Sequence, residues 1–305
     1  MSMLKPQRLY PGSRVEVVIP ASPVRPEFWE SGIQALRDLG FDVHHSTDVY
    51  RKWRYLAGAD EVRRNELLRA IQDPAVDGVF FARGGYGSSR LLNAFPELSQ
   101  VTPKVLMGCS DITSIHLYFQ LKHNWIVFHG PMASGDFARG QVHMDSLSKA
   151  LMQTEPYDLA PQSIETLIPG TAEGVLTGGC LTLIDASIGT PWEPVWDDAI
   201  LFLEDVGTKP YQIDRMLTRL KIAGKLNGVK AFIFGEMKEC IQIENQGYTL
   251  QEVVLDLLAE FQKPIFYNFP SGHVSRMNWT LPFGVRANVT SESGFRLDIL
   301  EGAVQ

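Results

Sequence analysis

The chain has 305 residues, of which 45% are hydrophobic and 21% are charged. This balance is typical of a globular protein and excludes a disordered chain, a collagen-like repeat and a coiled coil. With 28 Lys+Arg against 35 Asp+Glu the net charge is −7. A surface of this sign repels phosphate backbones, so we expect no nucleic-acid partner. At about 150 residues per domain, the length predicts two domains.

The cysteines and the N-terminal segment bear on where the protein works. Cys109, Cys180 and Cys240 are too few and too scattered for a disulfide framework, and their spacing does not suggest zinc. Residues 1–12 lack the apolar run of a signal peptide, and no stretch approaches the roughly 18 apolar residues of a membrane helix. We therefore expect a cytoplasmic protein in a reducing compartment, without a membrane partner.

In the first half, short apolar runs alternate with amphipathic stretches, which is typical of an α/β protein. The predicted strands are 15–19, 41–45, 78–82, 104–107 and 126–128. The predicted helices are 26–39, 60–71, one from about Ser88, one from about Asp111, and 144–152. Residues 1–153 are therefore predicted to form a mostly parallel, Rossmann-like sheet flanked by helices.

Residues 154–172 are predicted to be a linker, because Pro156, Pro161 and Pro169 interrupt a stretch of little periodicity. Residues 173–305 are predicted to form a smaller, mixed α/β domain. Its predicted strands are 200–203 and 231–234, its predicted helices are 211–222 and 250–261, and its tail is a hairpin of 285–289 and 295–300.

A candidate nucleophile lies where the strand 104–107 ends. The strand is broken at Gly108, and Ser110 sits at the turn into the next helix, which is the geometry of a nucleophile elbow. The helix N-terminus would direct backbone amides at a developing negative charge. The Gly-x-Ser-x-Gly pattern is incomplete, because Ile112 occupies the last glycine position. The alternative is that Ser110 or Asp111 only caps the helix.

Residues 83–87 read Arg-Gly-Gly-Tyr-Gly and also lie between a strand and a helix. Three glycines in five residues let the backbone approach a ligand closely. One interpretation is a phosphate cradle, although the phosphate-loop and dinucleotide spacings fail. Another is an oxyanion hole shared with the amide that follows Ser110, since loops at the carboxyl ends of neighbouring strands meet in one crevice. A tight turn without a ligand is the third.

Candidate acids and bases follow in the second half. Glu204 and Asp205 end an apolar strand, where they either need partners or are solvated. Glu204 could orient a histidine, and Asp205 could hold nearby backbone. His273 lies in a glycine-flanked loop that presents a general base or leaves the ring merely exposed; His129 is its strongest rival. A serine needs a base and the base needs an orienting acid, so Ser110, Glu204 and His273 fit a triad assembled across the domain interface.

Several linked motifs make the sequence resemble a known family. In order they are Ala21-Ser22-Pro23, Tyr55-Leu56-Ala57-Gly58, Arg83-Gly84-Gly85-Tyr86-Gly87, Gly108-Cys109-Ser110-Asp111-Ile112-Thr113, His129-Gly130-Pro131-Met132, Leu203-Glu204-Asp205-Val206 and Asn278-Trp279-Thr280-Leu281-Pro282-Phe283-Gly284. With them, the chain resembles the LD-carboxypeptidases, a family of serine peptidases also called murein tetrapeptide carboxypeptidases. The resemblance runs from about residue 10 to about residue 286.

The resemblance implies a Ser110, Glu204 and His273 triad, with an oxyanion hole made by the backbone amides of Gly85 and Asp111. Members of the family release the terminal D-Ala from cell-wall tetrapeptides through an acyl-enzyme. They work in the cytoplasm during peptidoglycan recycling, use no metal or cofactor, and are often homodimers. The implied substrate is a small muropeptide. A related branch, of the microcin C self-immunity type, hydrolyses peptidyl-nucleotide antibiotics and carries a longer insertion, so the length of this chain favours the wall-recycling branch.

The substrate's terminal carboxylate needs a cation or amide donors. Arg83 and Arg276 are the candidates, with Tyr86 beside the first, although either arginine could instead form a surface ion pair.

Two other functions remain open. Ser146 and Lys149 match the Ser-x-x-Lys of penicillin-binding enzymes, but no Lys-Thr-Gly accompanies them. A non-catalytic protein that binds a small anion through its glycine-rich loops is the other.

Overall fold

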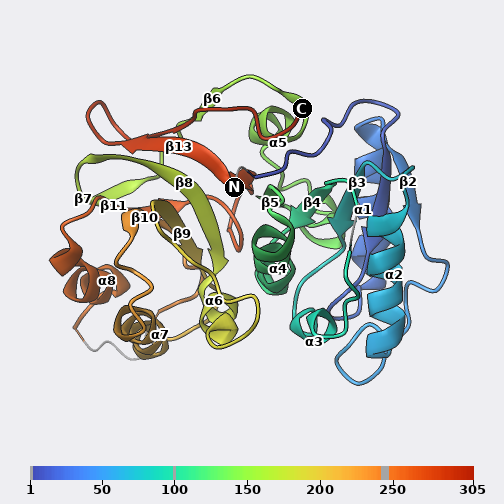
Figure 1. The fold of residues 1–305 in the computed structure, drawn as a ribbon, viewed down its shortest axis with the longest axis horizontal. Helices are drawn as coiled ribbons and strands as arrows, with labels where there is room; N and C mark the ends of the chain where they lie inside the picture. The colour runs from blue at the N-terminus through green and yellow to red at the C-terminus, as the bar shows by residue number, and fades with distance from the viewer. Residues whose placement is uncertain (1–2, 99–100, 242–246) are drawn as a thin grey trace.

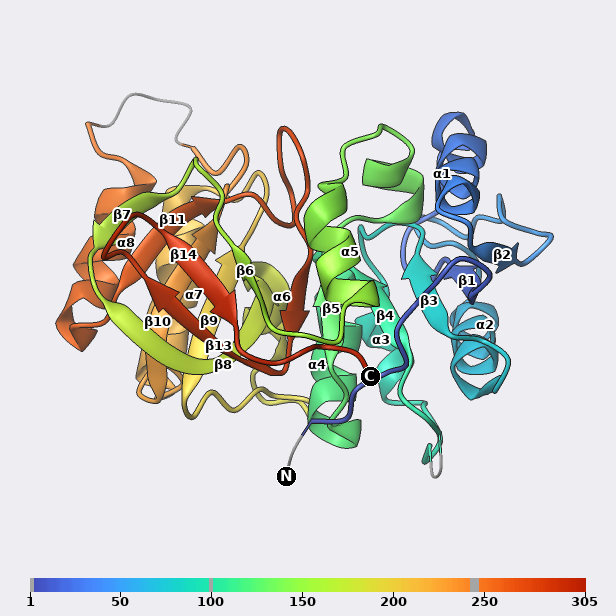
Figure 2. The ribbon, with the colours of Figure 1, turned by 90° about the horizontal axis from the view of Figure 1, so that it is seen from above.

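The computed structural model describes residues 3–98, 101–241 and 247–305. Within these residues the strands form two sheets that lie side by side (Figures 1 and 2). No helix in this part of the chain has the length and apolarity of a membrane span. Buried side chains from both halves form one hydrophobic cluster, so the two sheets share a core.

The first sheet has the order β12-β5-β4-β3-β1-β2 among the described residues. Its strands are β1 (Arg14–Val18), β2 (Asp42–His45), β3 (Gly78–Phe81), β4 (Val105–Gly108), β5 (Val127–His129) and β12 (Leu281–Phe283). Neighbouring strands are parallel except β12, which runs antiparallel to β5. The associated helices are α1 (Pro26–Asp38), α2 (Asp60–Gln72), α3 (Ser89–Leu92), α4 (Thr113–His123) and α5 (Met144–Met152). Covered faces explain why β3 and β4 are apolar throughout.

The second sheet has the order β6-β14-β13-β8-β9-β10-β11-β7, again over the described residues. Its strands are β6 (Tyr157–Leu159), β7 (Glu165–Ile168), β8 (Thr171–Cys180), β9 (Ala199–Glu204), β10 (Val229–Gly235), β11 (Ile265–Phe269), β13 (Val285–Thr290) and β14 (Arg296–Ile299). The run from β8 to β11 is parallel and the remaining pairs are antiparallel. Helices α6 (Leu181–Ser187), α7 (Pro210–Ile222) and α8 (Leu250–Leu258) lie together below it in Figure 1.

A mostly parallel sheet beside a mixed one confirms the predicted α/β fold. The predicted helix 144–152 coincides with α5, and the other predicted elements of the first half differ from the structure mainly at their ends. The helix predicted from about Asp111 begins instead as a short 3₁₀ turn, Ser110–Ile112, that leads into α4.

The main differences lie where glycine and proline obscured the pattern. Residues 154–172, predicted to be a linker, contribute β6 and β7, which pair with β14 and β11 at the two edges of the second sheet. The strand β12 was also missed; it contains Pro282, which an edge strand tolerates. The strand β12 follows residue 173 in the sequence and yet belongs to the first sheet. The domain boundaries at 153 and 173 remain a prediction.

The two sheets contact each other near the site. Helix α4 contacts both α6 and β8 and lies between the sheets (Figures 1 and 2). At the carboxyl end of β5, the ring of His129 lies 5.2 Å from that of Phe202 on β9. The carboxyl end of β5 therefore contacts β9 across the shared core.

Candidate active site

Ser110 lies on a sharp turn at the carboxyl end of β4. Its φ of +63° places a residue other than glycine in the left-handed region, which only a few per cent of such residues adopt. A side chain at Gly108 would come within 3.2 Å of Phe81, so the strand end is tightly packed there. Ser110 caps neither the 3₁₀ turn nor α4. The structure therefore contradicts the interpretation of Ser110 as a helix cap.

The glycine-rich loop passes directly over Ser110. A Cβ on Gly84 would lie 2.7 Å from the Cβ and 2.8 Å from the Oγ of Ser110. The carboxylate of the buried Asp111 accepts the backbone amide of Ser88 at 2.8 Å, so Asp111 holds this loop rather than capping the helix. Ser22 supports it from the other side, because its Oγ accepts the amide of Tyr86 at 3.2 Å. The hydrogen bonds of Asp111 and Ser22 thus hold the loop backbone close to Ser110.

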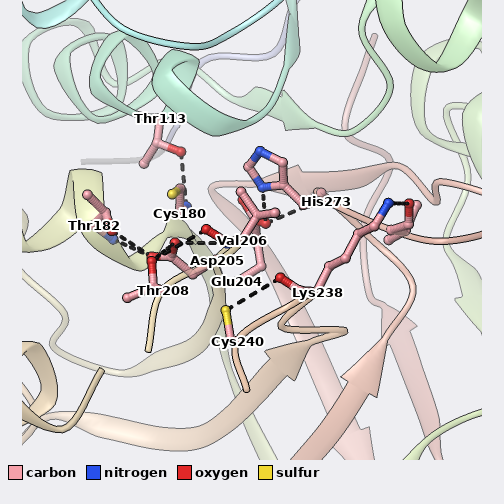
Figure 3. Close-up of polar contacts among 12 residues, drawn as sticks. Thr113, Cys180, Thr182, Glu204, Asp205, Val206, Thr208, Lys238, Cys240 and His273 are labelled. Carbon is pink, nitrogen blue, oxygen red and sulfur yellow. Dashed lines mark hydrogen bonds and ion pairs between the residues drawn. The ribbon is translucent and has the colours of Figure 1, made fainter. Parts of the chain in front are cut away.

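Glu204 and His273 form a direct pair (Figure 3). Glu204 ends β9 and is fully buried. Its Oε2 accepts the ring Nδ1–H of His273 at 2.7 Å and the backbone amide of His273 at 3.1 Å. Since a carboxylate only accepts, the ring carries its proton on Nδ1 and leaves Nε2 free to take another.

Asp205 has a different task, although it adjoins Glu204 in the sequence. Its carboxylate accepts hydrogen bonds from Thr182, Val206 and Thr208 at 2.8 to 2.9 Å (Figure 3). Both acids are buried, which excludes the alternative that they are solvated at the strand end. The choice that the sequence left open is therefore resolved: Glu204 contacts the histidine and Asp205 organises the backbone around the start of α6.

The electrostatic surroundings of His273 favour its charged form. Burial alone would lower the pKa of the imidazole, but the charge and hydrogen bond of Glu204, with smaller contributions from Asp205 and Asp136, raise it above its ordinary value. The side chain is 21% exposed, so one edge of the ring remains accessible. The ring can therefore hold a proton that it has taken from a nucleophile.

Two contacts bring the Ser110 turn to the Glu204–His273 pair. Thr113, three residues after Ser110, accepts the backbone amide of Cys180 at 3.0 Å (Figure 3). Cys180 is the strand partner of Glu204. Among the described residues the His273 ring bonds to Glu204 and not to Ser110 Oγ. Catalytic hydrogen bonds are often longer in substrate-free structures and tighten when substrate binds.

The competing histidine is not available for catalysis. His129 is fully buried, its ring stacks on Phe283 at 5.3 Å, and burial lowers its pKa well below the ordinary value.

The residues of the Ser-x-x-Lys string make structural contacts. Ser146 is buried and donates to the carbonyl of His143 at 2.9 Å, while Lys149 pairs with Asp145 at 2.9 Å on the surface.

The candidate substrate-binding residues differ in their surroundings. Arg83 is half-buried and donates to the carbonyl of Pro23 at 2.9 Å; burial and then the nearby charge of Arg25 lower its pKa. Neither arginine has an ion pair within the described part of the chain, which contradicts the surface-ion-pair alternative for Arg83. Tyr86 is exposed and its ring lies 5.8 Å from that of Tyr55. Arg276 is exposed on the histidine loop.

Sequence reasoning missed the residues that hold the histidine loop. Glu236 accepts the amide of Ser275 at 2.8 Å, and Lys238 donates to the carbonyl of Val274 at 3.4 Å. The side chain of Asn278 bonds both the amide and the carbonyl of Gly272. The polar residues of the Asn278-Trp279-Thr280 motif were the available signal for Asn278, whereas Glu236 and Lys238 lie 39 and 36 residues from their partners in the loop.

Comparisons with known proteins find matches to both halves of the chain. Residues 15–130 match the model of the LD-carboxypeptidase N-terminal domain, and residues 173–289 match that of the C-terminal domain. The chain is 33% identical to the probable murein peptide carboxypeptidase of Bacillus subtilis over 289 residues, which is 93% of this chain and 90% of that one.

Solved structures show the same fold. A muramoyltetrapeptide carboxypeptidase from Oxalobacter formigenes superposes with a TM-score of 0.82 at 28% identity, covering 95% of this chain and 99% of that one. An MccF-like protein from Bacillus anthracis superposes with a TM-score of 0.88 at 25% identity, covering 98% of this chain and all of that one. Both domain models and a relative along nearly the whole chain lead to the same conclusion: the protein belongs to the LD-carboxypeptidase family of serine peptidases.

Proposed function

We propose that this protein hydrolyses the amide bond that joins the L-centre of a diamino acid to the terminal D-Ala of a cell-wall tetrapeptide. The observation that carries the proposal is the Glu204–His273 pair, to which the strained Ser110 turn is connected through Thr113 and Cys180. The names of the relatives from Bacillus subtilis and Oxalobacter formigenes, a murein peptide and a muramoyltetrapeptide carboxypeptidase, support the substrate class.

In the proposed mechanism Ser110 is the nucleophile. The Nε2 of His273 takes the hydroxyl proton as Ser110 Oγ attacks the carbonyl carbon, and Glu204 stabilises the imidazolium that forms. His273 then gives the proton to the departing amine of D-Ala, leaving an acyl-enzyme on Ser110. Water attacks the ester with His273 again as base, and proton return to Ser110 releases the shortened peptide.

The negative charge on the carbonyl oxygen would be bound by the backbone amides of Gly85 and Asp111. Support comes from the glycine-rich loop, which approaches Ser110 so closely that Gly84 has no room for a side chain. In a serine peptidase, the loss of one such donor costs about 3–4 kcal/mol of transition-state stabilisation. The 3₁₀ turn and α4 after Ser110 add the partial positive charge of a helix N-terminus.

We further propose that Arg83 binds the terminal carboxylate of the substrate. It lies beside the oxyanion loop, close to a second arginine, Arg25, and both lack an ion pair within the described residues. Two neighbouring cations without a carboxylate partner are a suitable environment for an anion. Tyr86, exposed next to them, would cover one side of the bound peptide.

The cellular setting is also a proposal. The scattered cysteines and the family resemblance favour the cytoplasm, where the protein would act on muropeptides during peptidoglycan recycling. A homodimer is the assembly we propose from the family resemblance, and sedimentation of the purified protein would test it.

The direct test measures D-Ala release from a tetrapeptide that contains diaminopimelate, beside cleavage of an acyl-adenylate amide. We expect D-Ala release from the first and little cleavage of the second. The matched tetrapeptide ending in L-Ala should be a poor substrate. Preferred cleavage of the acyl-adenylate would instead place the protein with peptidyl-nucleotide hydrolases, an alternative favoured by its likeness to the MccF-like protein of Bacillus anthracis.

A further inference from the structure

The loop that carries His273 is attached to both sheets. It begins after β11, in the second sheet, and ends at β12, which belongs to the first. In the first sheet Leu281 of β12 is the register partner of His129 on β5, and β5 in turn pairs with β4, which leads to Ser110. The loop therefore ends in the same sheet as β4, the strand that presents the nucleophile, with β5 between them.

Asn278, five residues after His273, connects the loop to the first half of the chain. It is fully buried. Its backbone amide donates to the carbonyl of Gln141 at 2.8 Å, and its carbonyl accepts the amide of His143 at 3.0 Å. These two bonds form a short parallel bridge around Val142. Asn278 is thereby fixed to a segment of the first half by its backbone alone.

The side chain of Asn278 reaches back to the start of the same loop. Its Oδ1 accepts the amide of Gly272 at 3.0 Å, and its Nδ2 donates to the carbonyl of Gly272 at 2.9 Å. Gly272 has a φ of +89°, and a Cβ there would lie 2.5 Å from the Cδ of Glu204. Asn278 thus holds the peptide that precedes His273 against the carboxylate that orients its ring.

The charged groups around this arrangement come from several elements. Glu204, Asp205 and Asp136 act on His273, while the neighbouring His129 is buried and held in its neutral form. Asp136 accepts the amide of Met132 at 3.0 Å, and the nearby Asn278 side chain helps to lower its pKa against the effect of burial. The other side of the loop is held by Glu236 and Lys238.

We propose that Asn278 is a positioning residue for the reaction, which fixes the Gly272–His273 peptide to residues 141–143 and so sets the imidazole relative to Ser110. The inference rests on the proposed roles of Ser110 and His273. It implies that contacts with the sheet that carries the nucleophile fix the position of the base, although the orienting acid, Glu204, belongs to the other sheet.

Asn278→Ala tests the proposal, with Asn278→Asp as a variant of the same shape that keeps the acceptor for the Gly272 amide, loses the donor to the Gly272 carbonyl and adds a negative charge near Asp136. Because a misplacement of about 1 Å can cost about 100-fold, we expect kcat to fall about 100-fold in the first variant and by at least about tenfold in the second, with KM nearly unchanged. Asn288→Ala is the matched control: Asn288 on β13 bonds Asp298 on β14 at 3.4 Å, outside the histidine loop, so its loss should leave kcat and KM unchanged.

Two readouts do not depend on the identity of the substrate. The rate at which a fluorophosphonate labels Ser110 should fall in parallel with kcat. The downfield proton signal of His273 Nδ1–H, visible in nitrogen-15 histidine spectra of the wild type, should shift or broaden in the Asn278 variants but not in Asn288→Ala. If the wild type is labelled but releases no D-Ala, the substrate assignment fails while the labelling rates still test Asn278.

The result that would overturn the proposal is a folded Asn278→Ala protein with an unchanged labelling rate and an unchanged His273 signal. A lower melting temperature accompanied by wild-type labelling would also overturn it, because Asn278 would then be merely structural. If Asn278→Ala does not fold, wild-type labelling and an unshifted His273 signal in Asn278→Asp would have the same consequence.

Discussion

One oxygen of Glu204, Oε2, accepts hydrogen bonds from both the backbone amide and the ring Nδ1 of His273, at 3.1 and 2.7 Å. The two bonds fix the position of the residue and the orientation of its ring at the same time. The fully buried carboxylate cannot exchange either donor for water without opening the core. Proton transfer to and from Nε2 is therefore prepared before a substrate arrives.

Removal of the nucleophile or the base should abolish most of the turnover. We expect Ser110→Ala and His273→Ala each to lower kcat about a thousand-fold or more, and the double variant to be little worse, because the two groups act as one unit. Rates of D-Ala release for the four proteins would check this. Losses that multiply in the double variant would contradict a shared mechanism.

Glu204→Gln should lower kcat by less than either of these changes. The amide keeps the shape of the side chain, but it no longer stabilises the imidazolium and can donate instead of accepting at Nδ1. Glu165→Gln, on the exposed edge strand β7, is the matched control and should have no effect. Wild-type kinetics in Glu204→Gln would show that the buried carboxylate is not the orienting group.

The pH profile of kcat/KM should show the raised pKa of His273. A base must be neutral to accept the serine proton, so activity falls as the pH drops below that pKa. Since Glu204 is the main group that raises it, the acid limb should have its midpoint above the ordinary histidine value of about 6.5. In Glu204→Gln the limb should move to lower pH. A midpoint below the ordinary value in the wild type would contradict this electrostatic account.

Gly84→Ala should destroy activity without unfolding the protein. The added Cβ would lie 2.7 Å from the Cβ of Ser110 and 2.8 Å from its Oγ, so the loop or the nucleophile must move. We expect at least about a 100-fold loss of kcat, by analogy with the loss of one oxyanion donor, and a small change in melting temperature. At Gly135 the nearest atom to an added Cβ is 3.6 Å away, so Gly135→Ala should remain active.

Arg83→Ala should raise KM more than it lowers kcat, if its guanidinium binds the substrate carboxylate in ground state and transition state alike. A hydrogen bond to a charged group is worth about 1.5–3 kcal/mol, which corresponds to an increase in KM of about 10- to 150-fold. Arg276→Ala is the comparison, because that exposed arginine is the other candidate. An increase in KM confined to Arg276→Ala would reverse the assignment.

The mostly parallel first sheet could be predicted from the sequence because its strands are buried on both faces and read as short apolar runs between amphipathic helices. The same logic failed for β12 and for the strands within 154–172. There, proline and glycine interrupt the pattern, and the strands exist because a neighbour offers an edge to pair with.

For the candidate site, the residue types and their order were visible in the sequence, because a strained serine turn, a glycine-rich loop and a glycine-flanked histidine are local features. The sequence could not decide between Glu204 and Asp205, adjacent residues at one strand end, or between His273 and His129. Those choices depend on which side chain faces which neighbour across the two sheets, and that is fixed by packing among segments up to 154 residues apart. The residue types and their local sequence context thus identified the candidate reacting groups, and tertiary contacts determined which acid and which base can form a pair.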